Sequence, residues 1–407
     1  MGRWSQVSRL VPFSPREWRI LRPLMLVGYF ESYSGALITV GAATIAAGLG
    51  VSTSAFAIGA AIVQLAGLGA IPVVRLADEL GRRRLLLVSM AGFTIATALT
   101  AISWSLAAFV AFSCVMRVFL ETEDTVATTA IAEEVRDDRR GNALAVLGAI
   151  AGLGSGSVAI LLLFENSELG WRILYVWPLA LMPLVAYLRR HLAETAAFER
   201  ARLAHRITGF WPTVDGRFRP WIWRLSVIQL MYGATQTAAL LYASDLARNV
   251  YHWSGRYTLV IVASAPFGTV GLLFGGRISD RIGRRPGTAL ALAGMGASVL
   301  VIFGGGEALF AVGFWLAVLA QGAQWPVIGA YVAELFPTEV RPTMHSFVLS
   351  FQTVGGALGL LVVGVLAPVV GVTEMMVGLG VACACSMLCL LGMPETRGAD
   401  LAGPARA

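Results

Sequence analysis

Two arginine-rich stretches decide the fold: RLADELGRRR at 75–84 and RISDRIGRRP at 277–286. They lie 202 residues apart in a chain that is otherwise almost wholly apolar. A nearly identical offset recurs, because Glu133 and Glu334 lie 201 residues apart, as do Arg140 and Arg341. Charged segments that repeat at about half the chain length indicate an internal duplication.

The composition places the chain in a bilayer. Of its 407 residues, 57% are apolar and only 14% are charged, too few polar side chains to cover a soluble globule of this size. The apolar residues form segments of about 20 residues, long enough to cross the hydrocarbon core as helices. We predict twelve spans: 23–48, 53–74, 85–103, 106–132, 142–164, 171–188, 223–246, 257–275, 287–304, 308–333, 345–370 and 375–392.

The distribution of arginine predicts the topology. If the N-terminus is cytoplasmic, Arg172, Arg248 and Arg256 are the only basic residues outside, and Arg117 lies within a span. The positive-inside rule therefore predicts that both termini are cytoplasmic in the plasma (inner) membrane. The net charge of +7 then reflects topology and not a nucleic-acid partner. The predicted parts are a cytoplasmic segment 1–22, a six-helix bundle 23–188, a cytoplasmic linker 189–222, a second six-helix bundle 223–392 and a cytoplasmic tail 393–407.

The cysteines give no sign of a metal or a cofactor. Cys114, Cys383, Cys385 and Cys389 all lie within predicted spans. A zinc site needs deprotonated thiolates and an entry path, whereas the stretch that holds the last three has no polar neighbour. We therefore interpret the cysteines as packing residues and expect neither a metal nor a cofactor.

Ionisable residues within spans are costly and mark functional sites. Glu31 lies in the first span, and the fourth carries Arg117, Glu121, Glu123 and Asp124. At about 100° per residue, Arg117, Glu121 and Asp124 project on one stripe, while Glu123 points away from it. A carboxyl group beside an arginine is suited to exchange a proton, so Glu31, Arg117, Glu121 and Asp124 are the predicted proton-coupling residues. A purely structural salt bridge is the alternative.

The predicted spans of the second half hold neutral polar and aromatic groups in place of deep charges. Amides and ring faces suit an oriented organic solute, although any single glutamine serves equally well as an interhelical hydrogen bond. The predicted substrate-binding residues are Gln229, Tyr232, Gln236, Gln321, Gln324, Trp325 and Gln352.

Charged residues at the predicted cytoplasmic ends of the spans form a third candidate set. We expect them to make networks that hold the two bundles closed on that side, the alternative being simple solvation at the surface. The predicted cytoplasmic gate comprises Asp78, Arg82, Arg83, Glu133 and Arg140 in the first half, and Asp280, Arg284, Arg285, Glu334 and Arg341 in the second.

These motifs resemble those of the major facilitator superfamily. The stretch GRISDRIGRR at 276–285 is similar to that family's loop after the second span, and VRLADELGRR at 74–83 is a copy with Val74 in place of glycine. YVAELFPTEVR at 331–341 and PETRG at 394–398 resemble the sugar porters and their metabolite:proton symporter relatives. The resemblance implies an all-α membrane protein with twelve transmembrane helices in two pseudo-symmetric six-helix bundles. It also implies an acid of span one, Glu31, facing Arg117, but Glu121 stands where the family motif has glycine.

The duplication and the resemblance together favour secondary transport over other functions. We expect a monomeric proton symporter in the lipid bilayer that moves a small organic solute, such as an organic acid, sugar or related metabolite, by alternating access. A proton-coupled exporter is the main alternative, but exporters of this family carry G-x-x-x-G-P in span five, and Leu153 follows Gly148 and Gly152 here. A membrane receptor or enzyme is less favoured, because we find no paired nucleophile and base and no phosphate-binding loop.

Overall fold

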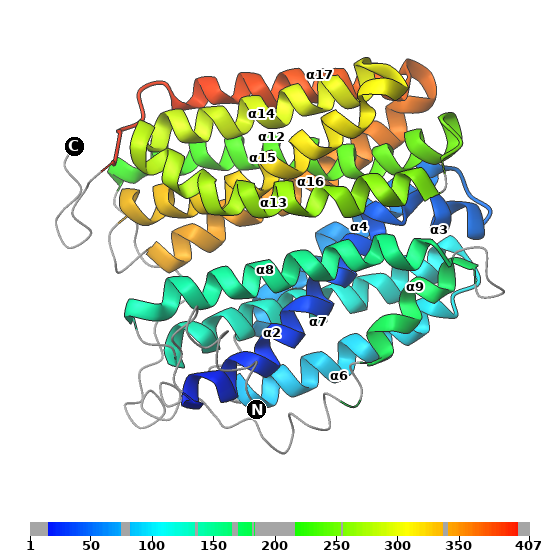
Figure 1. Cartoon of the computed structure of the whole chain (residues 1–407), viewed down its shortest axis with the longest axis horizontal. Coiled ribbons are helices and arrows are strands. Elements are labelled where there is room, and N and C mark those ends of the chain that lie inside the picture. The colour runs from blue at the N-terminus through cyan, green and yellow to red at the C-terminus, as the bar shows by residue number, and fades with distance from the viewer. Residues whose placement is uncertain are drawn as a thin grey trace, which may run out of the picture. The chain divides into compact units, whose positions relative to one another are not determined.

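The described chain is built of helices. The computed structural model describes residues 15–74, 82–134, 137–164, 170–180, 183, 216–253, 255–336 and 341–397, and these contain no strand (Figure 1). The α-helices are α2 (Pro15–Val40), α3 (Ala42–Gly48), α4 (Thr53–Ala66), α6 (Arg82–Ala101), α7 (Leu106–Glu134), α8 (Asp137–Leu162), α9 (Ile173–Val176), α12 (Arg219–Asp245), α13 (Gly255–Ile282), α14 (Arg284–Gly304), α15 (Gly306–Leu335), α16 (Arg341–Val370) and α17 (Val372–Cys385). Shorter turns are η1 (Gly67–Gly69), η2 (Gly170–Arg172), η3 (Trp177–Ala180), η4 (Gly216–Phe218), the π-helical η5 (Leu246–Val250) and η6 (Ser386–Leu390).

Within these residues, seven helical segments are long and apolar enough to cross a membrane. Five of them follow α12, where each covers a predicted span of the second half. The helices α2, α7 and α8 cover three more predicted spans, and α7 carries the charged residues discussed above. Of the sixth predicted span, 171–188, the structure describes residues 171–180 and 183. The number twelve therefore stays a prediction.

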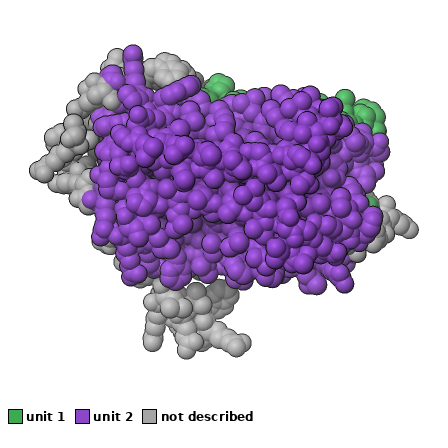
Figure 2. All heavy atoms as spheres, turned by 90° about the horizontal axis from the view of Figure 1, so that it is seen from above, with its two compact units in different colours: residues 1–37, 66–161, 167–208 green, residues 38–65, 162–166, 209–407 purple. Residues whose placement is uncertain are grey.

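The chain divides into two compact units, coloured separately in Figure 2. Unit 1 comprises residues 1–37, 66–161 and 167–208, and unit 2 comprises 38–65, 162–166 and 209–407. Most of the first predicted bundle lies in unit 1 and the whole of the second lies in unit 2. Residues 38–65, which the sequence assigns to the first bundle, pack with the second.

Within each unit, one close approach between helix backbones repeats at the duplication offset. In unit 1, a Cβ atom at Gly154 of α8 would overlap the carbonyl oxygen of Tyr29 in α2. In unit 2, a Cβ atom at Gly355 of α16 would overlap the carbonyl oxygen of Leu230 in α12. Both members of this second contact lie 201 residues beyond those of the first. Helices in lipid gain attraction by packing backbones closely at small residues, so the duplication preserved a structural contact.

The packing of residues 38–65 on unit 2 depends on another glycine. A Cβ atom at Gly364 of α16 would lie 2.9 Å from Ile58 Cγ1 and 3.0 Å from the Ser54 carbonyl oxygen of α4. The N–H of Ala43 in α3 donates to the Ser244 hydroxyl of α12 at 3.3 Å. These contacts join α3 and α4 to α12 and α16 within one unit.

We expect Gly154→Ala to destabilise the protein because the new methyl group meets backbone that cannot rotate away. Overpacking of this kind costs about 1–3 kcal/mol. The matched control is Gly152→Ala on the same helix, where a Cβ atom meets nothing within 4 Å. That control should be neutral or gain up to about 1 kcal/mol from helix propensity. Thermal unfolding of the purified proteins in detergent measures both, and equal stability of the two variants would contradict the close approach.

Candidate functional site

An ion pair on α7 lies among the predicted proton-coupling residues. Arg117 Nη2 lies 2.6 Å from Glu121 Oε1, one helical turn along, and their side chains are 16% and 34% exposed. Gly67 of η1 makes room for the pair, because a Cβ atom there would lie 3.2 Å from Glu121 Cγ. Spacing of i and i+4 explains the contact from local sequence alone. The charge of Arg117 is therefore balanced on its own helix.

Glu31 of α2 and Asp124 of α7 form the second contact of this group. Their side chains are hydrogen-bonded to one another. A carboxylate can only accept hydrogen bonds, so a hydrogen bond between two carboxyl groups requires a proton on one of them. The pair therefore holds one proton in this arrangement and titrates as a coupled pair.

Arg117 also reaches the helix that carries Glu31. A Cβ atom at Gly35 of α2, one turn beyond Glu31, would lie 3.9 Å from Arg117 Nη1. The structure therefore places Arg117 with Glu121 and Glu31 with Asp124, and brings all four side chains together in unit 1. Among the described residues, Arg117 forms its ion pair with Glu121 and not with Glu31, the partner that the resemblance implies.

In unit 2, four of the predicted substrate-binding residues form one chain of amide hydrogen bonds. Gln324 Nε2 of α15 donates to Gln229 Oε1 of α12 at 2.7 Å. Gln229 Nε2 donates to Gln352 Oε1 of α16 at 3.2 Å, and Gln352 Nε2 donates to Gln236 Oε1 of α12 at 3.1 Å. Three helices are thus joined through side-chain amides. Each amide orients the next, so the chain holds a fixed direction from donor to acceptor.

The other three predicted substrate-binding residues lie outside this chain. Tyr232 is 1% exposed, and its hydroxyl has no hydrogen-bond partner among the described residues. Trp325 is 62% exposed, whereas its neighbour Gln324 is 2% exposed. Gln321 is partly exposed one turn before Trp325 on α15. Gln229 and Gln324 are structural links as well as candidate contacts, because both are buried and bonded to protein.

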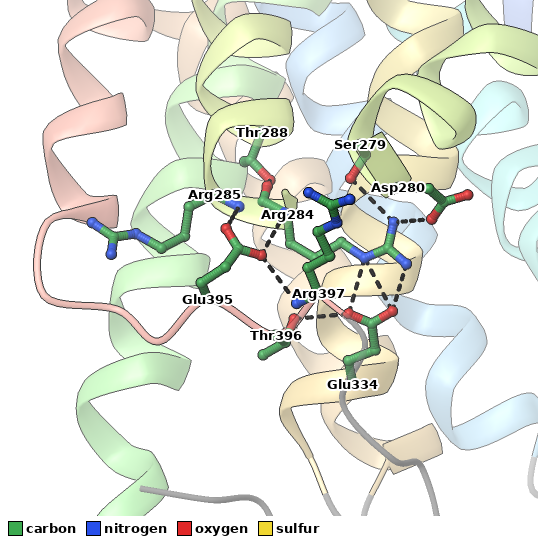
Figure 3. A network of polar contacts seen from close by, with 9 residues as sticks. All are labelled: Ser279, Asp280, Arg284, Arg285, Thr288, Glu334, Glu395, Thr396 and Arg397. Atoms are coloured by element: carbon green, nitrogen blue, oxygen red, sulfur yellow. Dashed lines mark hydrogen bonds and ion pairs between the residues drawn. The ribbon is translucent and has the colours of Figure 1, made fainter. Parts of the chain in front are cut away.

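A charge network joins the ends of α13, α14 and α15 to the segment after η6 (Figure 3). Arg284 lies at its centre: Nη2 is 2.5 Å from Glu334 Oε1, Nε is 2.9 Å from Glu334 Oε2, and Nη1 is 2.6 Å from Asp280 Oδ1. The Thr396 hydroxyl donates to Glu334 at 2.8 Å. The side chains of Arg284 and Glu334 are 10% and 12% exposed, so this pair is shielded from water.

Glu395 accepts hydrogen bonds from the first turn of α14. The backbone N–H groups of Arg284 and Arg285 donate to its carboxylate at 2.7 Å and 3.1 Å. A carboxylate at a helix N-terminus satisfies N–H groups that have no intrahelical partner and balances the helix dipole. Gly283 makes the contact possible, because it has φ of 110° and a Cβ atom there would lie 2.6 Å from Glu395 Oε2.

The described residues thus bring together Asp280, Arg284 and Glu334 of the predicted gate, and Arg285 through its backbone. The remaining members lie outside the description. Asp78 falls in a segment without described structure, and nothing is described of five further side chains, those of Arg82, Arg83, Glu133, Arg140 and Arg341. Most of the linker 189–222 also lies outside the described residues.

Sequence reasoning missed a polar contact around Asp245, at the end of α12. Its carboxylate accepts hydrogen bonds from Thr53 at the start of α4 and, at 2.7 Å, from Asn249 of the π-helical turn η5. The signal was present in the predicted topology, because Thr53 and Asp245 both lie at span ends on the predicted outer side. Their partnership was not readable from the sequence, since they are far apart along the chain.

Comparison with known proteins identifies the family. The model of the Major Facilitator Superfamily matches residues 24–272 and 225–406, so the chain belongs to this superfamily. A "Probable 4-methylmuconolactone transporter" of Cupriavidus pinatubonensis is 27% identical over 339 residues, which are 79% of this chain and 77% of the relative. A "Gallate transporter" of Pseudomonas putida is 25% identical over 393 residues, which are 87% of this chain and 86% of the relative.

A solved structure shows the same fold. The inward-open xylose transporter XylE of E. coli superposes with a TM-score of 0.73 at 15% identity, covering 95% of this chain and 98% of that one. The predicted fold class, an all-α membrane protein of the major facilitator fold, is confirmed. The protein is therefore a multi-pass membrane protein and a transporter of small solutes, and not an enzyme.

We expect Glu334→Gln to destabilise the protein more than Asp280→Asn, although both acids bind Arg284. Removing Glu334 breaks the shielded pair and leaves Arg284 with the exposed Asp280 as its ion-pair partner, which costs up to about 3 kcal/mol. The Asp280 side chain is 61% exposed, so its pair with Arg284 contributes about 1 kcal/mol or less. Thermal unfolding in detergent compares the two variants. A larger loss for Asp280→Asn would contradict the described burial.

Proposed function

We propose that the protein is a proton symporter that imports a small organic solute by alternating access. The observation that carries this proposal is the hydrogen bond between Glu31 and Asp124 in unit 1. Two carboxyl groups that share one proton in the interior of a transporter can give it up only if the second charge finds compensation. The adjacent arginine offers that compensation.

Arg117 is suited to couple the two charge states. While the acids hold a proton, Arg117 pairs with Glu121. When the proton leaves, the new carboxylate attracts the guanidinium, which already reaches Gly35 on the helix of Glu31. A change of partner for Arg117 shifts α2 relative to α7. Proton release and helix movement would thereby be linked, which is what coupling requires.

The second half provides the proposed solute contacts. The amide chain ends at Gln236, whose Oε1 accepts from Gln352 and whose Nε2 donates to none of the described residues. An amide N–H suits an oxygen acceptor, such as the carboxylate or carbonyl oxygen of an organic acid. Two of the relatives carry 4-methylmuconolactone and gallate in their names, both oxygen-rich ring compounds. We therefore favour an organic acid or related metabolite over an unfunctionalised hydrophobic compound.

We propose that the Arg284 network, together with the corresponding charged residues predicted in the first half, closes the cytoplasmic side. The network joins three helix ends to the segment after η6 within unit 2, so we expect these ends to move together. The plasma membrane location with cytoplasmic termini rests on the arginine distribution. Export in place of import is the second candidate, and Leu153 after Gly148 and Gly152 disfavours it, since the exporter motif has proline at that position.

The direct test is uptake of labelled gallate and 4-methylmuconolactone into proteoliposomes that contain the full chain. An inwardly directed proton gradient should drive accumulation, and collapse of the gradient with an ionophore should reduce it to equilibration. Protein-free liposomes provide the background. Uptake that ignores the gradient would contradict proton symport, and accumulation only under the reversed gradient would indicate export.

Glu31→Gln should abolish accumulation of the solute and leave exchange intact. The amide has the shape of the protonated acid but cannot lose a proton, so coupling is lost while the solute site remains. Counterflow measures exchange, and gradient-driven uptake measures coupling, both over a range of pH. Undiminished accumulation with its pH dependence retained would remove Glu31 from the mechanism.

Gln352→Ala should weaken apparent solute affinity more than Gln321→Ala. Gln352 is the middle link of the amide chain, so its loss removes two hydrogen bonds and leaves Gln236 unoriented. A lost set of hydrogen bonds at a polar site costs about 1–3 kcal/mol, or roughly 5-fold to 150-fold in affinity. Gln321 lies on α15 outside the chain and is the matched control. The same affinity for both variants would indicate that the chain is purely structural.

A further inference from the structure

Glu123 of α7 is a buried acid that the proposed coupling scheme does not use. Its side chain is 1% exposed, and neither carboxylate oxygen has a hydrogen-bond partner among the described residues. The neighbouring acids are satisfied, because Glu121 pairs with Arg117 and Asp124 bonds to Glu31. Glu123 therefore differs from the acids on either side of it.

The position of Glu123 explains its isolation. The ring of Phe119 packs against Gly92 of α6. Glu123 lies one turn after Phe119 on the same face of α7, so its Cβ atom lies at the interface between α6 and α7. Consecutive helices joined by a short loop are antiparallel, so the level of Glu123 corresponds to one turn before Gly92 on α6. Ser89 stands there. It is 0% exposed, and its hydroxyl likewise lacks a partner in the described structure.

The internal duplication shows what has changed at this position. The residue 201 positions after Glu123 is Gln324, which is also buried and donates to Gln229. The residue 201 positions before Gln229 is Gly28, which has no side chain. The first half has therefore kept a buried polar residue on the fourth span, but with an acid in place of the amide and without the partner.

The charged surroundings of Glu123 do not favour an anion. The acids near it are Asp124, the next residue on its own helix, and Glu31 on α2. Among the described side chains of α6, the charged one is Arg84, which is exposed at the start of that helix, and η1 has none. An ionised carboxylate that is buried without a partner costs several kcal/mol. The acid is therefore held in its neutral form in this conformation.

We propose that Glu123 is a second proton-carrying residue, which holds its proton between α6 and α7 in this conformation and releases it when the opposite conformation supplies a donor. In that step the O–H bond of the carboxyl group breaks, the proton passes to water, and the carboxylate that remains accepts a hydrogen bond from the Ser89 hydroxyl. A residue needed only for packing would not retain a group with unmet hydrogen bonds. The inference rests on the proposed proton symport and adds a second proton to it.

The decisive experiment is infrared difference spectroscopy of the purified full chain in lipid nanodiscs, titrated from mildly acidic to alkaline pH. We expect a protonated-carboxyl band at neutral pH in addition to that of the Glu31–Asp124 pair; this additional band should be absent in Glu123→Gln and should disappear from the wild type as the pH rises. Glu121→Gln is the matched control and should keep the band, because Glu121 is ion-paired. Ser89→Ala should keep the band to higher pH, because the carboxylate then lacks its donor.

Two results would overturn the proposal. A spectrum unchanged by Glu123→Gln would show that Glu123 is ionised, and a band that does not titrate would show a permanently neutral packing residue. If Glu123→Gln does not fold, labelling of the wild type with dicyclohexylcarbodiimide, followed by peptide mass spectrometry, replaces it. This reagent modifies protonated buried carboxyl groups, so an unlabelled Glu123 would equally refute the idea.

Gallate accumulation gives the functional counterpart. Losing one of two coupled protons should lower the accumulation ratio about tenfold for each unit of pH gradient, since one pH unit per proton corresponds to a factor of ten. Gallate counterflow by Glu123→Gln should remain near the wild-type rate. An unchanged accumulation ratio in this variant would refute the second proton. Failure of the wild type to accumulate solute would instead refute the proposed symport, and the infrared titration would still decide on Glu123.

Discussion

The cost of an uncompensated charge in a hydrocarbon environment governs the arrangement of this protein. A charged side chain at the centre of a bilayer costs about 3 kcal/mol or more, so each one must find a partner or a proton. In unit 1, Arg117 is balanced by Glu121, and Glu31 is hydrogen-bonded to Asp124. In unit 2, the helices α12, α15 and α16 carry neutral amides at the amide chain in place of charges. Gln229, Gln324 and Gln352 form hydrogen bonds with one another there.

The two halves have kept the same backbone packing while their chemistry diverged. The contact of Gly154 with Tyr29 recurs as the contact of Gly355 with Leu230, and any side chain at either glycine would separate the helices. Positions free of that constraint have changed. Glu31 corresponds to Tyr232 at the same offset, and Glu123 corresponds to Gln324. At these two positions the first half has acids and the second half has neutral hydrogen-bonding groups, which suits separate proposed tasks of proton handling and solute recognition.

The motif at 276–285 fixes the geometry where α13 ends and α14 begins. Gly283 adopts a backbone conformation that favours glycine, and the absence of a side chain there admits Glu395 to the first turn of α14. The next residue, Arg284, then reaches Glu334 and Asp280 with its guanidinium. Gly283, Arg284 and Glu395 therefore depend on one another for their positions. Replacing any of them would affect the packing of α13, α14 and α15 together.

The sequence by itself determined the fold class, because the length and apolar composition of each helix decide whether it crosses the bilayer, and the positions of the arginines decide its orientation. It also determined which residues on α7 share a stripe, since Arg117 and Glu121 are one turn apart. Tertiary structure alone decided the partners between helices: Glu31 with Asp124, Gln229 with Gln352, and Thr53 with Asp245. Helical periodicity sets the direction of a side chain but not the neighbouring helix it meets. The isolation of Glu123 likewise became visible only once α6 and α7 were packed together.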